Sequence, residues 1–251
     1  MELIFLGTGG GRYVMMDQLR STAGFQLGID KKIIHFDPGP GALLRYSQMK
    51  LSPSKLDGII ISHVHTEHSS EAGALIEGMT YGGKTKRGFV ITNKTFSETI
   101  SPYYKKLPKD FFILSAGREI DLGIKIKAIK CVHGDPDTIG FLIKGKEGSL
   151  YYTSDTGLIE EQLKVRADVV VANLTALKGD GRMGIQEATQ LANGIKPRKM
   201  ILTHFGRKVL SYGPERIAKD MRDSTGVDVL AVRDSQLVNL ELKQTVLGTF
   251  K

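Results

Sequence analysis

The 251-residue sequence predicts an α/β (α+β) protein in which β-sheets are covered by helices on their outer faces. Two observations support this class. Short runs rich in β-branched and aromatic residues recur along the chain, and helix-like stretches follow some of them. No internal repeat stands out, and no apolar run approaches the roughly 20 residues of a membrane span. We therefore expect a single domain over residues 1–251 and no membrane segment.

The predicted strands are apolar or alternating runs that end in glycine, proline or polar residues. They are Glu2–Leu6, Gly24–Ile29, Lys32–Asp37, Gly58–Ser62, Gly88–Thr92, Phe111–Leu114, Ile124–Cys131, Ile139–Ile143, Ser149–Thr153, Val169–Asn173, Met200–Thr203, Val227–Val232 and Leu237–Leu240. The predicted helices are Gly41–Met49, Glu71–Met79, Gln186–Asn193 and Pro214–Ser224. Every histidine except His35 falls at or just after the end of a predicted strand, where loops carry function. His35 lies inside a strand and is interpreted as structural.

Glycines 7 and 9–11 follow the first predicted strand, where a phosphate-binding loop would lie. However, Arg12 occupies the position of the third glycine of a dinucleotide fingerprint, and no Gly-Lys-Ser/Thr follows. The run is therefore interpreted as a tight turn near the mouth of the active site.

The formal net charge of +8 favours an anionic partner, either a small molecule or a nucleic acid. The basic residues occur in short groups such as Lys84/Lys86/Arg87 and Lys105/Lys106/Lys109, which we interpret as solvated faces. Aromatic residues do not interleave with them as a stacking platform would require. Cys131 is the single cysteine, and the N-terminus shows no signal-peptide pattern, so we expect a cytoplasmic protein.

The segment most informative about chemistry is Ile59-Ile60-Ile61-Ser62-His63-Val64-His65-Thr66-Glu67-His68. An apolar strand ends at Ser62, and His63 and His65 point to the same side of an extended chain. Glu67 and His68 lie on the turn before the next helix. Imidazole and carboxylate are ligands of zinc, iron and manganese. Because three histidines and a carboxylate within six residues are hard to explain by core packing, this segment predicts a metal site.

His63-Val64-His65-Thr66-Glu67-His68 resembles the His-x-His-x-Asp-His signature of the metallo-β-lactamase superfamily, with Glu67 in the position of the aspartate. His133, Asp155 and His204 follow in the order of that family's later motifs. The Leu6–Gly11 start and the Phe36–Gly41 turn are similar to those of its ribonuclease Z and phosphodiesterase branch.

This resemblance implies a four-layer αββα sandwich with two divalent metal ions, in the first place zinc, with manganese or iron as alternatives. One ion would be held by His63, His65 and His133, the second by Glu67, His68 and His204, and Asp155 would bridge them. A hydroxide shared by the two ions would attack the substrate. Asp37 and Asp135 are expected to orient metal-bound histidines.

Two positions depart from the family pattern. Glu67 is one methylene longer than aspartate, which displaces the carboxylate by roughly 1.5 Å, whereas metal–ligand distances vary by about 0.2 Å. The second metal site is therefore expected to be shifted, weaker or empty, or Glu67 acts as a base outside it. Arg182 occupies the position of the ribonuclease Z histidine that protonates the leaving group. Arginine cannot give up a proton at neutral pH, so its expected role is to clamp a phosphate.

The function predicted from these residues is a metal-dependent hydrolase of a phosphodiester or related anionic ester, with Glu67, Asp155 and Arg182 as catalytic candidates. The long arm that grips tRNA in bacterial ribonuclease Z is absent, which argues against a tRNA-end nuclease. Two alternatives remain open: a redox enzyme with a single iron, and a non-catalytic binding protein that keeps the fold. Related proteins often pair, which makes a homodimer possible.

Overall fold

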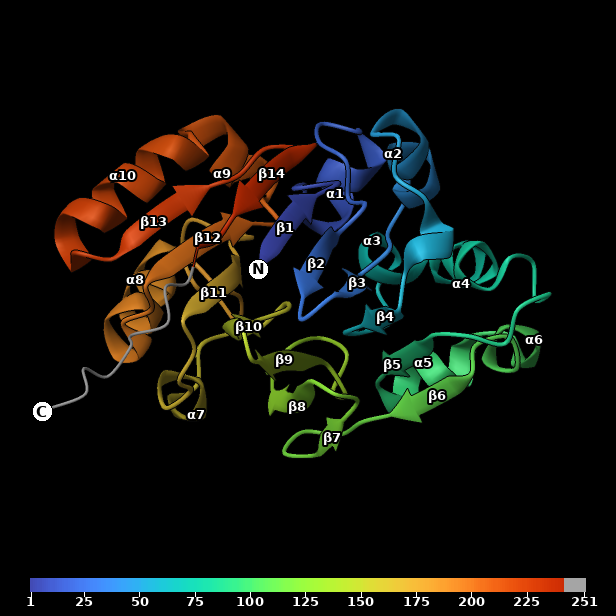
Figure 1. The fold of residues 1–251 in the computed structure, drawn as a ribbon. Helices are drawn as coiled ribbons and strands as arrows, with labels where there is room; N and C mark the ends of the chain where they lie inside the picture. Colours follow the sequence, from blue (N-terminus) through green and yellow to red (C-terminus); the bar gives the residue numbers. More distant parts are fainter. Residues whose placement is uncertain (242–251) are drawn as a thin grey trace, which may run out of the picture.

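Two β-sheets of seven strands each form the frame of the protein, as a computed structural model describing residues 1–241 shows (Figure 1). The first sheet has the order β14 (Gln236–Asn239), β1 (Glu2–Phe5), β2 (Phe25–Ile29), β3 (Lys32–Phe36), β4 (Gly58–Ile61), β5 (Phe89–Thr92) and β6 (Asp110–Ile113). The second has the order β13 (Asp228–Ala231), β12 (Lys199–Thr203), β11 (Val169–Asn173), β10 (Gly148–Tyr152), β9 (Ile139–Gly145), β8 (Lys125–Lys130) and β7 (Glu119–Asp121).

The apolar residues of the central strands divide between an inner core and two outer cores. In β4, Ile60 belongs to the core between the sheets, whereas Ile59 and Ile61 face the helices outside the first sheet. In β12, Ile201 faces inward, and Met200 lies in the core beneath the helices of the second sheet. This alternation follows from the two-residue period of a strand, and burial on both faces explains why these strands are continuously apolar. The expected four-layer αββα sandwich is confirmed.

Four longer helices cover the sheets. The α2 (Ala42–Gln48) and α4 (Ala72–Thr80) helices pack on the first sheet, and α8 (Ile185–Ile195) and α10 (Pro214–Thr225) pack on the second. Helix α10 starts with Pro214 in its first turn and ends at Gly226 in the left-handed region, which are favourable residues at the two ends of a helix. No helix in residues 1–241 combines the length and hydropathy that a membrane crossing requires.

The strand directions bring five loops to one edge of the sandwich. Strands β3 to β6 run parallel, as do β10 to β13, and β8 runs in the same direction as β10 because both are antiparallel to β9. The segments that follow β3, β4, β8, β10 and β12 carry Asp37, His63, His133, Asp155 and His204. Ligand sites of open α/β sheets lie at this carboxyl edge.

The predicted strands and helices are all present, with ends that differ by one or two residues. Several short elements were missed: strand β7 and the helices α1 (Gly11–Met16), α3 (Thr66–Ser69), α5 (Lys94–Thr99), α6 (Pro102–Lys105), α7 (Glu160–Leu163) and α9 (Arg207–Tyr212). Helices of four to six residues are stabilised by tertiary packing, and their sequences are too short to show a period. The glycine-rich run, interpreted from the sequence as a tight turn, leads directly into α1, whose first residue is Gly11.

Replacing Ile60 by alanine should lower the free energy of unfolding by about 2–5 kcal/mol, because it leaves a cavity between the two sheets. Ile60 is 0% exposed, whereas Leu44 on α2 is 61% exposed. Leu44→Ala should therefore change stability by no more than about 0.5 kcal/mol. Urea unfolding of the metal-free protein compares the two variants. Equal effects would contradict the assignment of Ile60 to the inner core.

Candidate metal centre

Three histidines that follow β4 and β8 aim ring nitrogens at one point. His63 Nε2 lies 3.0 Å from His65 Nδ1, and His133 Nε2 lies 3.1 Å from the same Nδ1. Nitrogens that share a tetrahedral zinc at about 2.0–2.1 Å are separated by roughly 3.3 Å. The three nitrogens therefore form a group that could hold a metal ion, with separations a few tenths of an ångström shorter than those of zinc ligands.

A second group contains Glu67, His68 and His204. Their ligand atoms lie within 4.8 Å of one another. The Nε2 atoms of His68 and His204 are buried and make no hydrogen bond in the described structure. A buried ring nitrogen that makes no hydrogen bond is costly, and both atoms face the Asp155 carboxylate, so the group could hold a metal ion. The extra methylene of Glu67 does not remove its carboxylate from this group.

Asp155 lies between the two groups. Its Oδ2 is 3.6 Å from His68 Nε2 and 3.8 Å from His133 Nε2, and its Oδ1 is 3.3 Å from His204 Nε2. Burial raises the pKa of Asp155, but His204 and His68 outweigh this effect and hold the pKa well below its ordinary value. A charged carboxylate thus faces histidines of both groups, which is the arrangement that a bridging ligand requires.

The buried carboxylate of Asp37 sets the orientation of two histidines. Its Oδ2 accepts hydrogen bonds from His68 Nδ1 at 2.9 Å, from Ser62 Oγ at 2.7 Å and from Tyr152 Oη at 2.6 Å. Ser62 Oγ in turn accepts the Nδ1 proton of His63 at 3.0 Å. With Nδ1 of both rings engaged in these hydrogen bonds, the Nε2 atoms of His63 and His68 face the cluster. Burial, followed by the nearby His68, lowers the pKa of His63 well below its ordinary value.

Tyr152 and Asn173 continue this network across the sandwich. The amide of Asn173 donates to Tyr152 Oη at 3.2 Å and to Asp155 Oδ1 at 2.8 Å. Burial and the neighbouring Asp37 raise the pKa of Tyr152 well above its ordinary value, which keeps its hydroxyl a donor. The network therefore connects Asp37 on the first sheet to Asp155 on the second. Sequence reasoning missed both residues, although each is the last residue of a strand that leads to this edge.

Asp135 contacts the backbone of the segment that carries His63 and His65. Its Oδ2 accepts hydrogen bonds from the Val64 amide at 3.3 Å and from Asn93 Nδ2 at 3.0 Å, and its hydrogen bonds in the described residues include no histidine ring. Asp135 thus holds the backbone between His63 and His65 in place of orienting an imidazole. In contrast, Asp37 contacts His68 directly, as the sequence predicted.

The backbone at the site adopts conformations that few sequences tolerate. Asp37, Ser154 and His204 have φ angles of +53°, +56° and +55°. Such left-handed residues cost energy and often mark functional sites. Gly10 lies so close to His204 that a Cβ atom would be 2.2 Å from its carbonyl oxygen, and its amide donates to Phe205 at 3.0 Å. The glycine-rich run therefore allows the N-terminal segment to pack against His204, a member of the candidate cluster.

Arg182 lies outside the cluster. Its side chain is exposed, on the loop that connects β11 to α8. This loop packs against the segment after Asp155, as the close approach of the two backbones shows: a Cβ on Gly157 would be 3.3 Å from the Gly181 carbonyl carbon.

The sixth histidine, His35, is buried with its Nδ1 3.2 Å from Tyr46 Oη, in agreement with a structural role.

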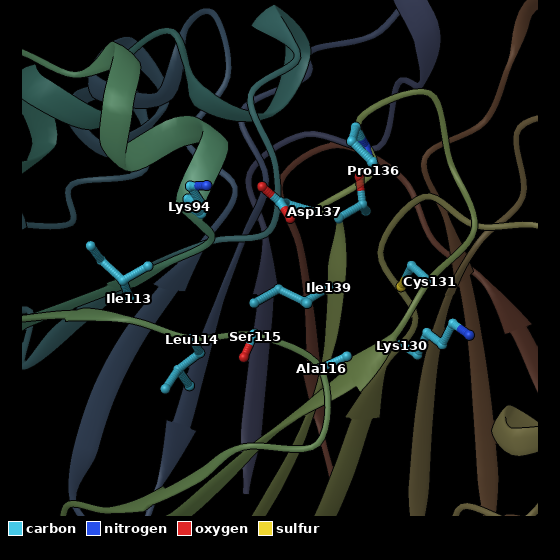
Figure 2. Close-up of a pocket in the computed structure, with 11 residues that line it drawn as sticks. Lys94, Ile113, Leu114, Ser115, Ala116, Lys130, Cys131, Pro136, Asp137 and Ile139 are labelled. Carbon is cyan, nitrogen blue, oxygen red and sulfur yellow. The ribbon is translucent and has the colours of Figure 1, made fainter.

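A cavity of about 490 Å³ adjoins the loop that carries His133 (Figure 2). Apolar side chains of Ile113, Leu114 and Ile139 form part of its lining, and Lys94 and Asp137 lie at its edge. Its volume is within the range of small-molecule sites, about 300–1,000 Å³. Its lining includes residues on both sides of His133 in the sequence but none of the seven residues of the cluster.

A family model described as the beta-lactamase superfamily domain matches residues 32–205, which include all seven residues of the cluster. The chain belongs to this superfamily. An uncharacterized protein from Methanocaldococcus jannaschii is 32% identical over 250 residues, covering 93% of this chain and 92% of that protein. A UPF0173 metal-dependent hydrolase from Sulfolobus acidocaldarius is 27% identical over 241 residues, covering 90% of this chain and all of that protein (100%).

Two further superfamily members are similar over different extents. A ribonuclease Z from Thermococcus onnurineus is 38% identical over 86 residues, which are 34% of this chain and 27% of that protein. The crystal structure of the metallo-beta-lactamase fold protein YhfI from Bacillus subtilis superposes with a TM-score of 0.78 at 18% identity, covering 94% of this chain and 98% of that one. The structural likeness supports the fold alone.

Asp37→Asn should weaken zinc binding about 10- to 100-fold, because it replaces one acceptor oxygen by an NH2 donor. Both oxygens of Asp37 are in use, Oδ1 by the Ser62 amide and Oδ2 by Ser62 Oγ and His68 Nδ1. Competition with a chromophoric chelator measures the affinity. Asp168→Asn is the matched control, since Asp168 also accepts bonds from a serine amide and hydroxyl, at 2.9 and 2.6 Å, but precedes β11 at the opposite edge. Equal losses in both variants would contradict the role of Asp37.

Zinc binding to the metal-free protein at pH 8 should release about one proton. Burial lowers the pKa of His68, but Asp155 and Asp37 outweigh it and raise the pKa to about 10. His68 is therefore protonated below that pH, and zinc must displace its proton, so affinity should rise with pH up to about 10. Calorimetric titrations in two buffers of different ionisation enthalpy count the protons. Identical heats in both buffers would refute this assignment.

Proposed function

We propose that this protein is a metal-dependent hydrolase of a phosphodiester or related anionic ester. The observation that carries the proposal is the convergence of seven side chains into three overlapping groups, which share His63 or His68. Asp155 lies within 3.8 Å of His68, His133 and His204. Two similarities support hydrolysis as the reaction class. The chain is similar to a protein named metal-dependent hydrolase over almost its whole length, and to a ribonuclease Z over a shorter segment.

The ligand set suits two divalent ions. His63, His65 and His133 would hold one ion, and Glu67, His68 and His204 would hold the other, with Asp155 in contact with both groups. When bound, the ions would supply Lewis acidity, which activates water at neutral pH and neutralises negative charge on the reacting ester. The Glu67 carboxylate lies within 4.8 Å of ring nitrogens of His68 and His204. This proximity favours the two-ion arrangement over a single redox-active iron.

The remaining residues of the chain would position the ions and the substrate. Asp37 and Ser62 keep the imidazole protons on the side away from the cluster. The net charge of +8 favours an anionic substrate, and Arg182, on the loop beside the Asp155 segment, would contact its charged group. The cavity beside the His133 loop would receive an apolar part of the substrate.

The cluster also limits the substrates that react readily. Five of the six histidines lie in the cluster and the sixth is buried in the core, so no histidine remains to protonate a leaving group. Arg182 cannot replace it, because a guanidinium does not release a proton at neutral pH. We therefore expect substrates whose leaving group is stable as an anion.

His63→Ala should lower the hydrolysis of bis(p-nitrophenyl) phosphate by the zinc-loaded protein by more than about 100-fold, since loss of a direct ligand exceeds the 10- to 100-fold effect of its outer partners. Circular dichroism checks that the fold is intact. Arg182→Ala should instead raise KM and leave kcat within a few-fold, because it removes binding that the ground state and transition state share. Unchanged turnover by a folded His63→Ala protein would rule out the proposed reaction.

A further inference from the structure

Packing brings two basic segments that are separate in the sequence onto one surface. Residues 81–87 lie between α4 and β5, and residues 103–109 run from within α6 to the start of β6. The amide of Lys109 donates to the Arg87 carbonyl at 3.1 Å, and Lys86 Nζ donates to the Lys106 carbonyl. Both segments lie at the right-hand side of Figure 1. We name this the α4–α6 basic surface, formed by Tyr81, Lys84, Lys86, Arg87, Tyr103, Lys105, Lys106 and Lys109.

Most of the positive charge on this surface is uncompensated. Arg87 pairs with Asp57, with 3.7 Å between guanidinium nitrogen and carboxylate oxygen. The ion pairs found within residues 1–241 include none of the five lysines of the surface. Lys84, Lys86, Lys106 and Lys109 are exposed. The surface therefore offers several free ammonium groups to a polyanion.

Two exposed aromatic rings accompany these cations. Tyr81 is 67% exposed and Tyr103 is 52% exposed. Lys84 Nζ lies 5.6 Å from the centre of the Tyr81 ring. Tyr81 ends α4 in the left-handed conformation, with φ +54°, and Gly82 and Gly83 follow it. Each ring lies near lysines of its own segment, and folding places the two segments side by side.

We infer that the α4–α6 basic surface binds single-stranded nucleic acid, through phosphate contacts to the lysines and stacking of bases on the tyrosines. Basic grooves with accessible aromatic rings bind single strands in this way. An anionic membrane would favour exposed Leu, Phe or Trp side chains that insert among the lipids. Within residues 1–241, the large apolar side chains that are exposed on this surface are Tyr81 and Tyr103. This composition favours nucleic acid over a membrane as the partner.

The surface is separate from the metal centre. The metal-binding residues follow the carboxyl end of β4, whereas Arg87 and Lys109 precede β5 and β6, which run parallel to β4. The two sites therefore lie at opposite edges of the first sheet, and the nine-residue α4 between them is about 13 Å long. The surface would hold a nucleic acid at a distance from the reacting centre, and the inference does not depend on the proposed hydrolysis.

The test is fluorescence anisotropy of a labelled 15-nucleotide oligouridine with the full-length protein in EDTA, between 50 and 200 mM salt. In Lys84→Ala/Lys109→Ala, the slope of log affinity against log salt should be shallower by about 1.4, since each phosphate contact to a single strand contributes about 0.7. Lys208→Ala/Lys219→Ala is the matched control, because these exposed lysines lie on α9 and α10, on the other side of Figure 1. The control should leave the slope at the wild-type value.

Stacking is tested separately with Tyr81. Tyr81→Ala should weaken binding about 5-fold or more, whereas Tyr81→Phe, which keeps the ring, should bind like the wild type. Anionic phosphatidylserine vesicles serve as the competing ligand. The inference is overturned if the wild type does not bind RNA, or if Lys84→Ala/Lys109→Ala binds RNA with the wild-type slope. It is also overturned if this variant binds vesicles more weakly but binds RNA as the wild type does. Every binding measurement is made without metal and without turnover. A failure of the nucleic-acid inference is therefore distinct from a failure of the hydrolase proposal.

Discussion

The hydrogen bonds of the Asp37 carboxylate are the interaction on which the geometry of the candidate metal centre depends. Histidine has two ring nitrogens, and only the one without a proton can bind a metal. Asp37 holds the Nδ1 proton of His68 directly and that of His63 through Ser62, so two imidazoles in different ligand groups share one orienting carboxylate. Because Asp37 is buried, these charge-assisted hydrogen bonds are strong and the rings are held rigidly.

The same network explains how two sheets build one site. Asp37 follows a strand of the first sheet, while Tyr152 and Asn173 end strands of the second sheet and carry the network to Asp155. A metal centre whose ligands come from both sheets requires their relative position to be fixed within tenths of an ångström. The inner apolar core brings the sheets together, and this buried polar network sets their alignment at the edge where the ligands lie.

The sequence predicted the parts of this arrangement that follow from local pattern. The apolar run Ile59–Ile61 and the histidines after it predicted a buried strand ending in a ligand cluster, and the family resemblance supplied the later motifs. Tyr152 and Asn173 were missed because a tyrosine or asparagine at the end of a strand has no distinctive spacing. Their role depends on contacts between distant segments. The basic surface was missed for the same reason, since the pairing of residues 81–87 with 103–109 is a tertiary contact.

The central claim is that the cluster binds two metal ions on either side of Asp155, and anomalous diffraction from zinc-loaded crystals at the zinc edge tests it most directly. The account predicts two peaks in each chain, one bounded by His63, His65 and His133 and the other by His68, His204 and the Glu67 carboxylate. A map without a peak at this cluster, from crystals grown with excess zinc, would contradict it.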